Sequence, residues 1–236
     1  MRAVLSALLL CLCLALPGAV RAQDAYALGV EASRRGDHET AARHYMRAAT
    51  EGDVRAFVSL GFLFDNGWGV IRNGAQAQEF YILAAGQGSV MAKNNLAYLW
   101  ARQNGLLAQA LCLSAQTLVE QPDNPFYLDT YGFILLRMDQ PARAEAYFRK
   151  ALRFQPDYAD ALEHLGDVMA MTGGAVTGGE ARDWWRRALA SPRDERQKAR
   201  LAAKLGGAPP PGDLNAHPPF TLRNPGLPAE CGVPSV

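Results

Sequence analysis

The sequence has little of several features that mark particular classes of protein. Its 236 residues include four cysteines and four histidines, too few for a disulfide-dense domain and few for a multi-ligand metal site. Its 24 basic and 23 acidic residues nearly balance, whereas a nucleic-acid-binding protein needs a basic surface to displace counterions. We therefore expect no nucleic-acid partner.

Long apolar runs are also scarce, and the one present lies at the start. Arg2 precedes an apolar run of 14 residues, Ala3–Leu16, and small residues in Val20-Arg21-Ala22 precede a cleavage point after Ala22. A spanning helix needs roughly 17–25 apolar residues, so residues 1–22 indicate a cleaved secretory signal. Cleavage leaves 22 basic and 23 acidic residues, and no later segment is apolar enough to span a membrane. We expect an exported protein, periplasmic or secreted.

Two interleaved series of residues recur along the rest of the chain. In the first, a large residue precedes Gly or Ala at intervals of 32 to 36 residues. In the second, a bulky residue stands between two alanines at spacings of 4 and 7, which keep the three on one face of a helix. The first series is Leu28-Gly29, Leu60-Gly61, Leu96-Ala97, Tyr131-Gly132 and Leu165-Gly166, and the second is Ala41/Tyr45/Ala48, Ala77/Tyr81/Ala84, Ala108/Cys112/Ala115, Ala144/Phe148/Ala151 and Ala181/Trp185/Ala188.

These series predict five helical hairpins, each stacked on its neighbours. Turn residues such as Gly36-Asp37, Asn73-Gly74 and Gln140-Pro141 separate the helices. Two stretches depart from the pattern. Residues 93–122 have Cys112 where the bulky aromatic is expected, and residues 173–179, GGAVTGG, indicate an extra loop.

Two parts of the chain resemble known repeat families. Residues 125–158 resemble a tetratricopeptide repeat, with Tyr131, Gly132, Ala144, Phe148, Ala151 and Pro156 at its signature positions. Residues 56–92 resemble the related Sel-one-like repeat, which has a longer Gly-x-Gly-Val loop, here Gly67-Trp68-Gly69-Val70. The resemblance covers residues 25–190 and implies an all-α, right-handed solenoid of about five helix-turn-helix repeats.

The chain is expected to divide into three parts. Residues 1–22 are the signal peptide, and residues 23–205 are the helical repeat domain. The domain ends in a mostly polar helix over Pro192–Leu205, which would cap the solenoid. Residues 206–236 contain eight prolines and few periodic apolar residues, which predicts an extended or disordered tail.

The resemblance implies that the first helix of each hairpin lines a concave groove. Aromatic and arginine side chains on these helices are the types that dominate binding energy at interfaces. The alternative is that the aromatic side chains pack between hairpins and the arginines are solvated. The candidate partner-binding residues are Tyr26, Val30, Arg34, Asn94, Tyr98, Arg102, Phe126, Asp129, Phe133, Arg137, Glu163 and Asp167.

The two cysteines that remain after cleavage, Cys112 and Cys231, leave two alternatives open. Cys112 is either a buried, inert thiol or one half of a disulfide with Cys231 that would hold the proline-rich tail against the solenoid. His38 and His44 are six residues apart and face different sides of a helix, so we expect no metal site and no cofactor.

No catalytic motif is present: the sequence has no Gly-x-Ser-x-Gly, no phosphate loop and no His-Glu-x-x-His. We therefore expect a scaffold or adaptor of the cell envelope that binds another protein or a peptide segment. Two alternatives stay open. One is an envelope enzyme related to β-lactam-binding or cell-wall hydrolases, and the other is a structural protein that acts through its proline-rich tail.

Overall fold

The computed structural model describes residues 17–207, which form eleven α-helices and no strand. The expected all-α fold is confirmed. The helices are α1 Pro17–Arg34, α2 His38–Thr50, α3 Val54–Asn66, α4 Gly74–Gly86, α5 Val90–Arg102, α6 Leu107–Glu120, α7 Pro125–Arg137, α8 Pro141–Phe154, α9 Ala159–Thr172, α10 Gly174–Ala190 and α11 Glu195–Gly206.

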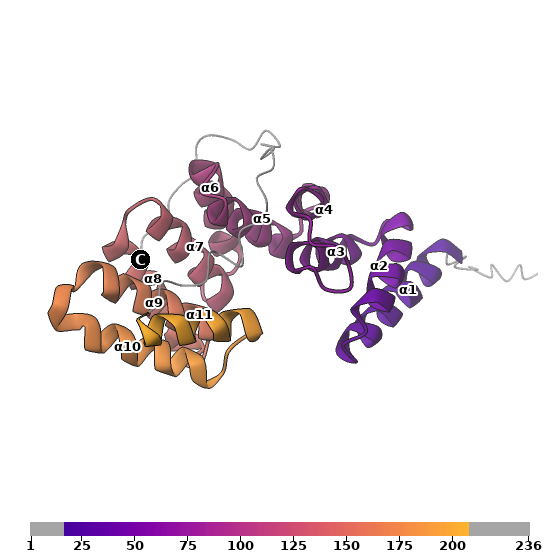
Figure 1. The fold of residues 1–236 in the computed structure, drawn as a ribbon. Coiled ribbons are helices and arrows are strands. Elements are labelled where there is room, and N and C mark those ends of the chain that lie inside the picture. The colour runs from indigo at the N-terminus through magenta and orange to yellow at the C-terminus, as the bar shows by residue number, and fades with distance from the viewer. Residues whose placement is uncertain (1–16, 208–236) are drawn as a thin grey trace, which may run out of the picture.

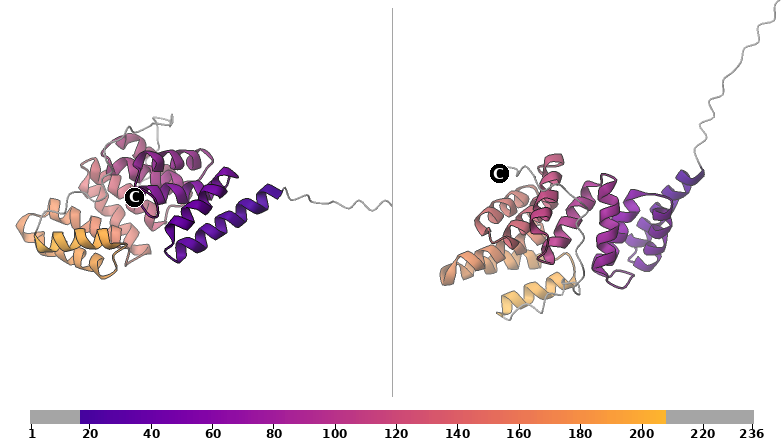
Figure 2. Two further views of the ribbon diagram at one scale, coloured as in Figure 1. Left: turned by 45° about the vertical axis from the view of Figure 1, so that its right-hand side comes forward. Right: turned by 90° about the horizontal axis from the view of Figure 1, so that it is seen from above.

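The first ten helices pair in sequence order into five antiparallel hairpins, from α1–α2 to α9–α10, and consecutive hairpins pack on one another. The row runs from the indigo to the orange end of the ribbon (Figure 1), and its curvature is visible in the two further views (Figure 2). The helix α11 follows the fifth hairpin and packs on α10. The five expected hairpins and the C-terminal helix are therefore all present.

Within each of four hairpins, a glycine of the first helix lies against a ring of the second. A Cβ atom added to Gly29 or Gly61 would come 2.5 Å from the ring of Tyr45 or Tyr81, and one added to Gly132 would come 2.7 Å from the ring of Phe148. The fourth contact joins Gly166 to Trp185, again at 2.5 Å. Only glycine allows the two helices to approach so closely, which explains the first sequence series.

In the third hairpin, different residues form the contact between the first and the second helix. In α2, α4 and α8, the small–bulky–small triplet begins at the fourth residue of the helix. The corresponding residues of α6 are Ala110, Ser114 and Thr117, each fully buried, whereas Ala108 is exposed. The expected triplet Ala108/Cys112/Ala115 was therefore wrong by two residues. Because Ser114 is much smaller than a ring, α5 carries Ala97 where the other first helices carry glycine.

The Gly-x-Gly-Val loop between α3 and α4 contacts the first hairpin. Gly67 ends α3 with φ of 70°, and Gly69 has φ of 66°. A Cβ atom on Gly69 would come 2.2 Å from the backbone carbonyl carbon of His38, and the Trp68 ring stacks on the His38 imidazole with centroids 4.9 Å apart. The longer loop thus fixes the second hairpin against the start of α2.

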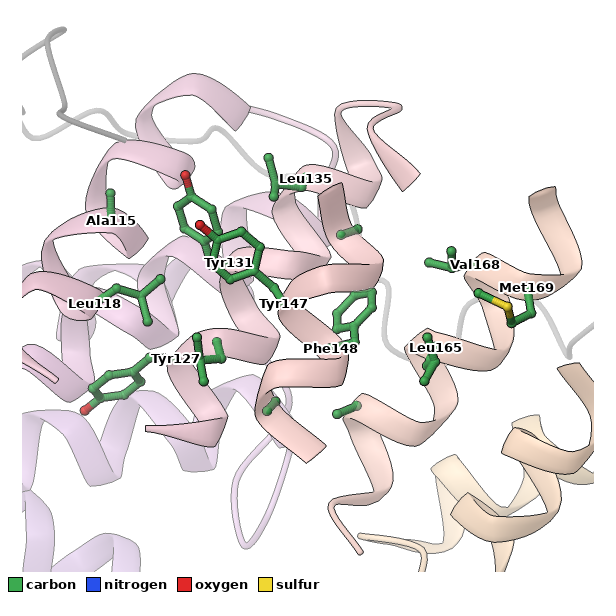
Figure 3. Packing of buried hydrophobic residues seen from close by; sticks show 14 of the residues in the cluster. Ala115, Leu118, Tyr127, Tyr131, Leu135, Tyr147, Phe148, Leu165, Val168 and Met169 are labelled. Carbon is green, nitrogen blue, oxygen red and sulfur yellow. The ribbon is translucent and has the colours of Figure 1, made fainter. Parts of the chain in front are cut away.

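The largest hydrophobic cluster extends from α6 to α10 (Figure 3). The rings of Tyr131 and Tyr147 meet between α7 and α8 with centroids 4.6 Å apart. The ring of Phe148 fills the space between Gly132 of α7 and His164 of α9. The Phe148 ring therefore contributes both to its own hairpin and to the contact with the next.

Several further expectations can be compared with the described residues. Residues 173–179 are not a loop, because α10 begins at Gly174. The helix α1 begins at Pro17 and so includes the expected cleavage point after Ala22. Cys112 is buried in α6 and is disulfide-bonded, while Cys11, Cys13 and Cys231 lie outside the described residues, so the Cys112–Cys231 pairing stays a prediction. The tail from residue 208 onwards also lies outside them.

We predict that Gly132→Ala lowers the free energy of unfolding by about 1–3 kcal/mol, because the new methyl group overlaps the Phe148 ring. The loss should be smaller when Phe148 is replaced by leucine. Chemical denaturation of the two single variants and the double variant measures this coupling. Gly86→Ala is the control, since an added Cβ there meets nothing within 4 Å. Equal losses for Gly132→Ala and Gly86→Ala would contradict the packing argument.

Candidate functional site: a pocket on the inner face

A pocket of about 730 Å³ opens on the face formed by the first helices α3, α5, α7 and α9. We call it the inner pocket. Its lining combines aromatic rings, carboxamides and charged side chains. Residues from α3, α5 and α7 form most of it, and the α8–α9 and α10–α11 connections complete it with Asp157, Tyr158, Ser191, Arg193 and Asp194.

One side of the inner pocket is a stripe of α5 residues four apart: Asn94, Tyr98 and Arg102. The Arg102 guanidinium lies 5.1 Å from the centre of the Tyr98 ring and donates to the Asp65 carboxylate of α3. Burial raises the pKa of Tyr98 to about 12, so its hydroxyl stays protonated and can donate a hydrogen bond. The Oδ1 atom of Asn94 is buried and accepts no hydrogen bond from the described residues.

The start of α7 supplies a second side. Asn124 caps this helix by accepting from the Phe126 backbone N–H at 3.0 Å, and Pro125 occupies the first turn, where its missing N–H costs nothing. The Phe126 ring is half exposed at the pocket and meets the Tyr158 ring edge to face, with centroids 5.0 Å apart. The cap therefore sets the position of an exposed apolar ring.

Asp129 lies one turn further into α7 and is almost fully buried. Its Oδ1 atom is 2.9 Å from Nδ1 of His164, and the His164 ring stacks on Phe133. Burial alone would lower the pKa of His164, but the carboxylates of Asp129, Asp160 and Glu163 together outweigh burial and raise it. The contact with the imidazole fixes the carboxylate of Asp129.

The connection to α11 closes the remaining side. Arg193 donates through Nη1 to both carboxylate oxygens of Asp160, at 3.1 and 3.0 Å. Asp194 caps α11 by accepting from the Gln197 backbone N–H at 2.7 Å. One helical turn along, Arg196 donates to the backbone carbonyl of Asn66 at 2.9 Å and so links the start of α11 to the end of α3.

The rest of α11 covers the inner face of α9 through a network of ion pairs. Lys204 donates to Oε1 of Glu163 at 2.8 Å and to Oδ1 of Asp167 at 2.6 Å, and Arg200 donates to Oε2 of Glu163 at 3.2 Å. Burial alone would raise the pKa of Glu163, but Lys204 and Arg200 lower it to about 2. Leu201 is the hydrophobic residue of α11 that is fully buried. Ion pairs therefore contribute much of the interaction that holds α11 on α9.

The predicted groove residues fall into three groups. Asn94, Tyr98, Arg102, Phe126 and Asp129 do line the inner pocket. Glu163 and Asp167 are on the same face but are covered by α11 of the same chain.

The third group, Tyr26, Val30, Arg34, Phe133 and Arg137, does not line the inner pocket. Tyr26 packs on Tyr45 with centroids 5.4 Å apart, and Val30 packs against the cluster of the first two hairpins. Phe133 lies between the rings of Tyr98 and His164. Arg34 and Arg137 are exposed. A role of these five residues in partner binding stays a prediction.

Sequence reasoning missed Asp65, Arg193 and the role of His164, because each acts through a residue 33 to 37 positions away. Within residues 17–207, no three His, Cys, Asp or Glu side chains are grouped so as to hold a metal ion. No helix among these residues has the length and apolar character needed to cross a membrane.

Comparisons with known proteins place the fold. No family model matches the chain. A TPR repeat-containing protein of Pseudomonas aeruginosa is 36% identical over 89 residues, which are 37% of this chain and 15% of that protein. A thermophilic TPR protein of Thermus thermophilus matches 78% of this chain and 98% of its own, with 20% identity and a TM-score of 0.60.

The fold is that of the tetratricopeptide and Sel-one-like repeat proteins. PilF of Pseudomonas aeruginosa matches 80% of this chain and 85% of its own at 18% identity, with a TM-score of 0.59. A protective antigen of uropathogenic Escherichia coli with a Sel-one-like repeat fold matches 78% and 41% at 23% identity, with a TM-score of 0.50. The chain combines features of both kinds of repeat: its fourth hairpin has the tetratricopeptide signature residues, and its second hairpin has the Gly-x-Gly-Val loop.

We predict that Glu163→Gln loosens α11. Loss of the carboxylate leaves Arg200 without its ion pair, while Asp167 still accepts from Lys204, so the attachment should weaken by about 2–3 kcal/mol. Hydrogen exchange of the backbone amides of residues 195–206 measures the change, with α8 as internal reference. The control is Glu195→Gln, which breaks an exposed pair with Lys198. Unchanged protection in Glu163→Gln would contradict the role of the network.

We also predict a pH-dependent contribution from His164. Because its pKa is raised in the folded protein, it stabilises the fold below its ordinary value of 6.5, and the contribution is lost as pH rises through the folded pKa. The groups that act on it are Asp129, Asp160 and Glu163. His164→Gln should therefore lower the free energy of unfolding more at about pH 5.5 than at about pH 9, by roughly 1–3 kcal/mol at the lower pH. A pH-independent difference in denaturation would refute this.

Proposed function

We propose that this protein is an exported adaptor of the cell envelope that binds a segment of a partner protein in the inner pocket. The observation that carries the proposal is the exposed apolar surface at that pocket. Phe62, Met91 and Phe126 come from three successive first helices, are 41%, 56% and 49% exposed, and all line the pocket. Apolar side chains gathered at a hollow of this size are typical of a binding surface.

The polar groups around these side chains suit a polypeptide ligand. The buried Oδ1 atom of Asn94 lacks a donor among the described residues, and the Tyr98 hydroxyl remains protonated. A backbone segment offers both N–H donors and carbonyl acceptors. The ionic groups Arg102, Asp65, Arg193 and Asp160 are held in pairs, which fixes the walls of the pocket. This arrangement favours recognition of a segment over catalysis.

The export part of the proposal rests on residues 1–22, where Arg2, a 14-residue apolar run and small residues before the expected cleavage point predict a secretory signal. The proline-rich residues 208–236 lie outside the described residues, so the alternative of a role for the tail stays open. The inner pocket offers exposed apolar side chains to test first.

Photocrosslinking in intact cells tests the proposal. Benzoylphenylalanine at position 126 should give a specific product with one envelope protein, because this side chain is half exposed and lines the inner pocket. The product should diminish when Asn94 is changed to leucine. Mass spectrometry of the same product should show a mature N-terminus at Gln23.

Position 119 is the matched control, because Val119 is 75% exposed on α6 and does not line the inner pocket. Equal amounts of crosslinked product from positions 119 and 126 would contradict binding of the partner in the inner pocket. An N-terminus at Met1 would refute cleavage.

A further inference from the structure

A second hollow, of about 440 Å³, lies in the fourth and fifth hairpins. It shares no lining residue with the inner pocket. We call it the outer pocket. It lies between the second helices α8 and α10, and Leu165 of α9 contributes to its lining. None of its lining residues belongs to α11.

The charged side chains that line the outer pocket are all basic: Arg149, Lys150, Arg153 and Arg187. No carboxylate lines it, although acidic and basic residues are almost equal in number in the whole chain. Arg153 is exposed and has no ion-pair partner among the described residues. Four cations that converge on one hollow produce a positive potential that favours an anionic ligand.

An indole ring adds a second, independent observation. Arg187 and Arg149 lie over the ring of Trp184, with guanidinium carbons 4.5 and 5.8 Å from its centre. Trp184 lines this hollow, and its buried Nε1–H has no acceptor among the described residues. A buried donor without an acceptor is costly, so packing within the described residues does not account for this side chain.

The surroundings distinguish between kinds of anion. Leu152, Leu165 and Ala146 give the outer pocket an apolar part, which a carboxylate-bearing peptide with an apolar side chain can fill. Glu145, Glu180 and Asp123 form ion pairs with the rim cations, at 2.7 and 3.9 Å to Arg149 and 3.7 Å to Lys150. These acids interrupt the positive surface, which disfavours an extended polyanion or a lipid surface and suits single carboxylates.

We infer that the outer pocket binds an acidic segment of a polypeptide, in which glutamate or aspartate side chains pair with Arg153 and Arg187 and a neighbouring apolar side chain contacts Leu152 and Trp184. The site does not depend on the proposed function of the inner pocket. With both sites occupied, the chain would join two partners on opposite sides of its C-terminal hairpins.

The probe is a fluorescein-labelled nonapeptide with two glutamates around one leucine, compared with the same peptide carrying glutamines. Fluorescence anisotropy with the full chain should show binding of the glutamate peptide alone, weakened by added salt. Arg153→Glu with Arg187→Glu should weaken binding at least about tenfold.

The matched control is Arg137→Glu with Arg186→Glu, which makes the same change in net charge at exposed arginines outside the outer pocket. It should leave the affinity within about twofold. Equal weakening by the two double variants, or equal binding of the glutamine peptide, would overturn the inference.

Two further probes separate other anions. The first is inorganic phosphate, and the second is vesicles that contain phosphatidylglycerol. If either binds the chain more tightly than the glutamate peptide does, and Arg153→Glu with Arg187→Glu abolishes that binding, the inference of an acidic peptide ligand is also overturned. The Phe126 crosslink reports on the inner pocket in the same variants. Its persistence without peptide binding would reject the outer site and leave the proposed function intact.

Discussion

The close approach of the two helices of a hairpin, which in four of the five hairpins packs a ring of the second helix on a glycine of the first, is the constraint on which the structure depends. It removes the space that a Cβ atom would need and leaves the ring free to contact the next hairpin as well, as Phe148 does between Gly132 and His164. The five hairpins can then stack in a curved row (Figure 2), and the first helices α3, α5, α7 and α9 lie side by side on one face. The inner pocket exists because of that shared face.

The fold could be predicted from the sequence because the repeated spacings lie within single hairpins. A glycine about 16 to 20 residues before a ring, with alanines four before and three after the ring, describes a hairpin almost completely. Two errors have physical causes. The helix α6 is rich in small residues, so two registers satisfy the same spacings, and burial alone distinguishes them. The glycine-rich residues 173–179 have low intrinsic helix propensity, yet α10 begins at Gly174, since tertiary packing can outweigh propensity.

The candidate site was predicted only in part. Its α5 and α7 residues follow from position within the repeat, so Asn94, Tyr98, Arg102, Phe126 and Asp129 could be named from the sequence. The covering of Glu163 and Asp167 could not, because it depends on charges of α11 that lie 37 to 41 residues further along the chain. Glu163 and Asp167, predicted from the sequence to bind a partner, are ion-paired with Arg200 and Lys204 of the same chain.

The hydrogen bond from Arg196 to the Asn66 carbonyl joins residues 130 positions apart, whereas each unit of a stacked repeat packs mainly on its neighbours. One such bond contributes only about 1 kcal/mol, but it acts together with the ion pairs that hold α11 on α9. A linear array unravels from either of its two free ends. Here α11 is bonded to the end of α3 in the second hairpin, which opposes unfolding from the C-terminal helices of the described solenoid. Local unfolding should therefore begin at the first hairpin, which has no such bond to a distant hairpin among the described residues.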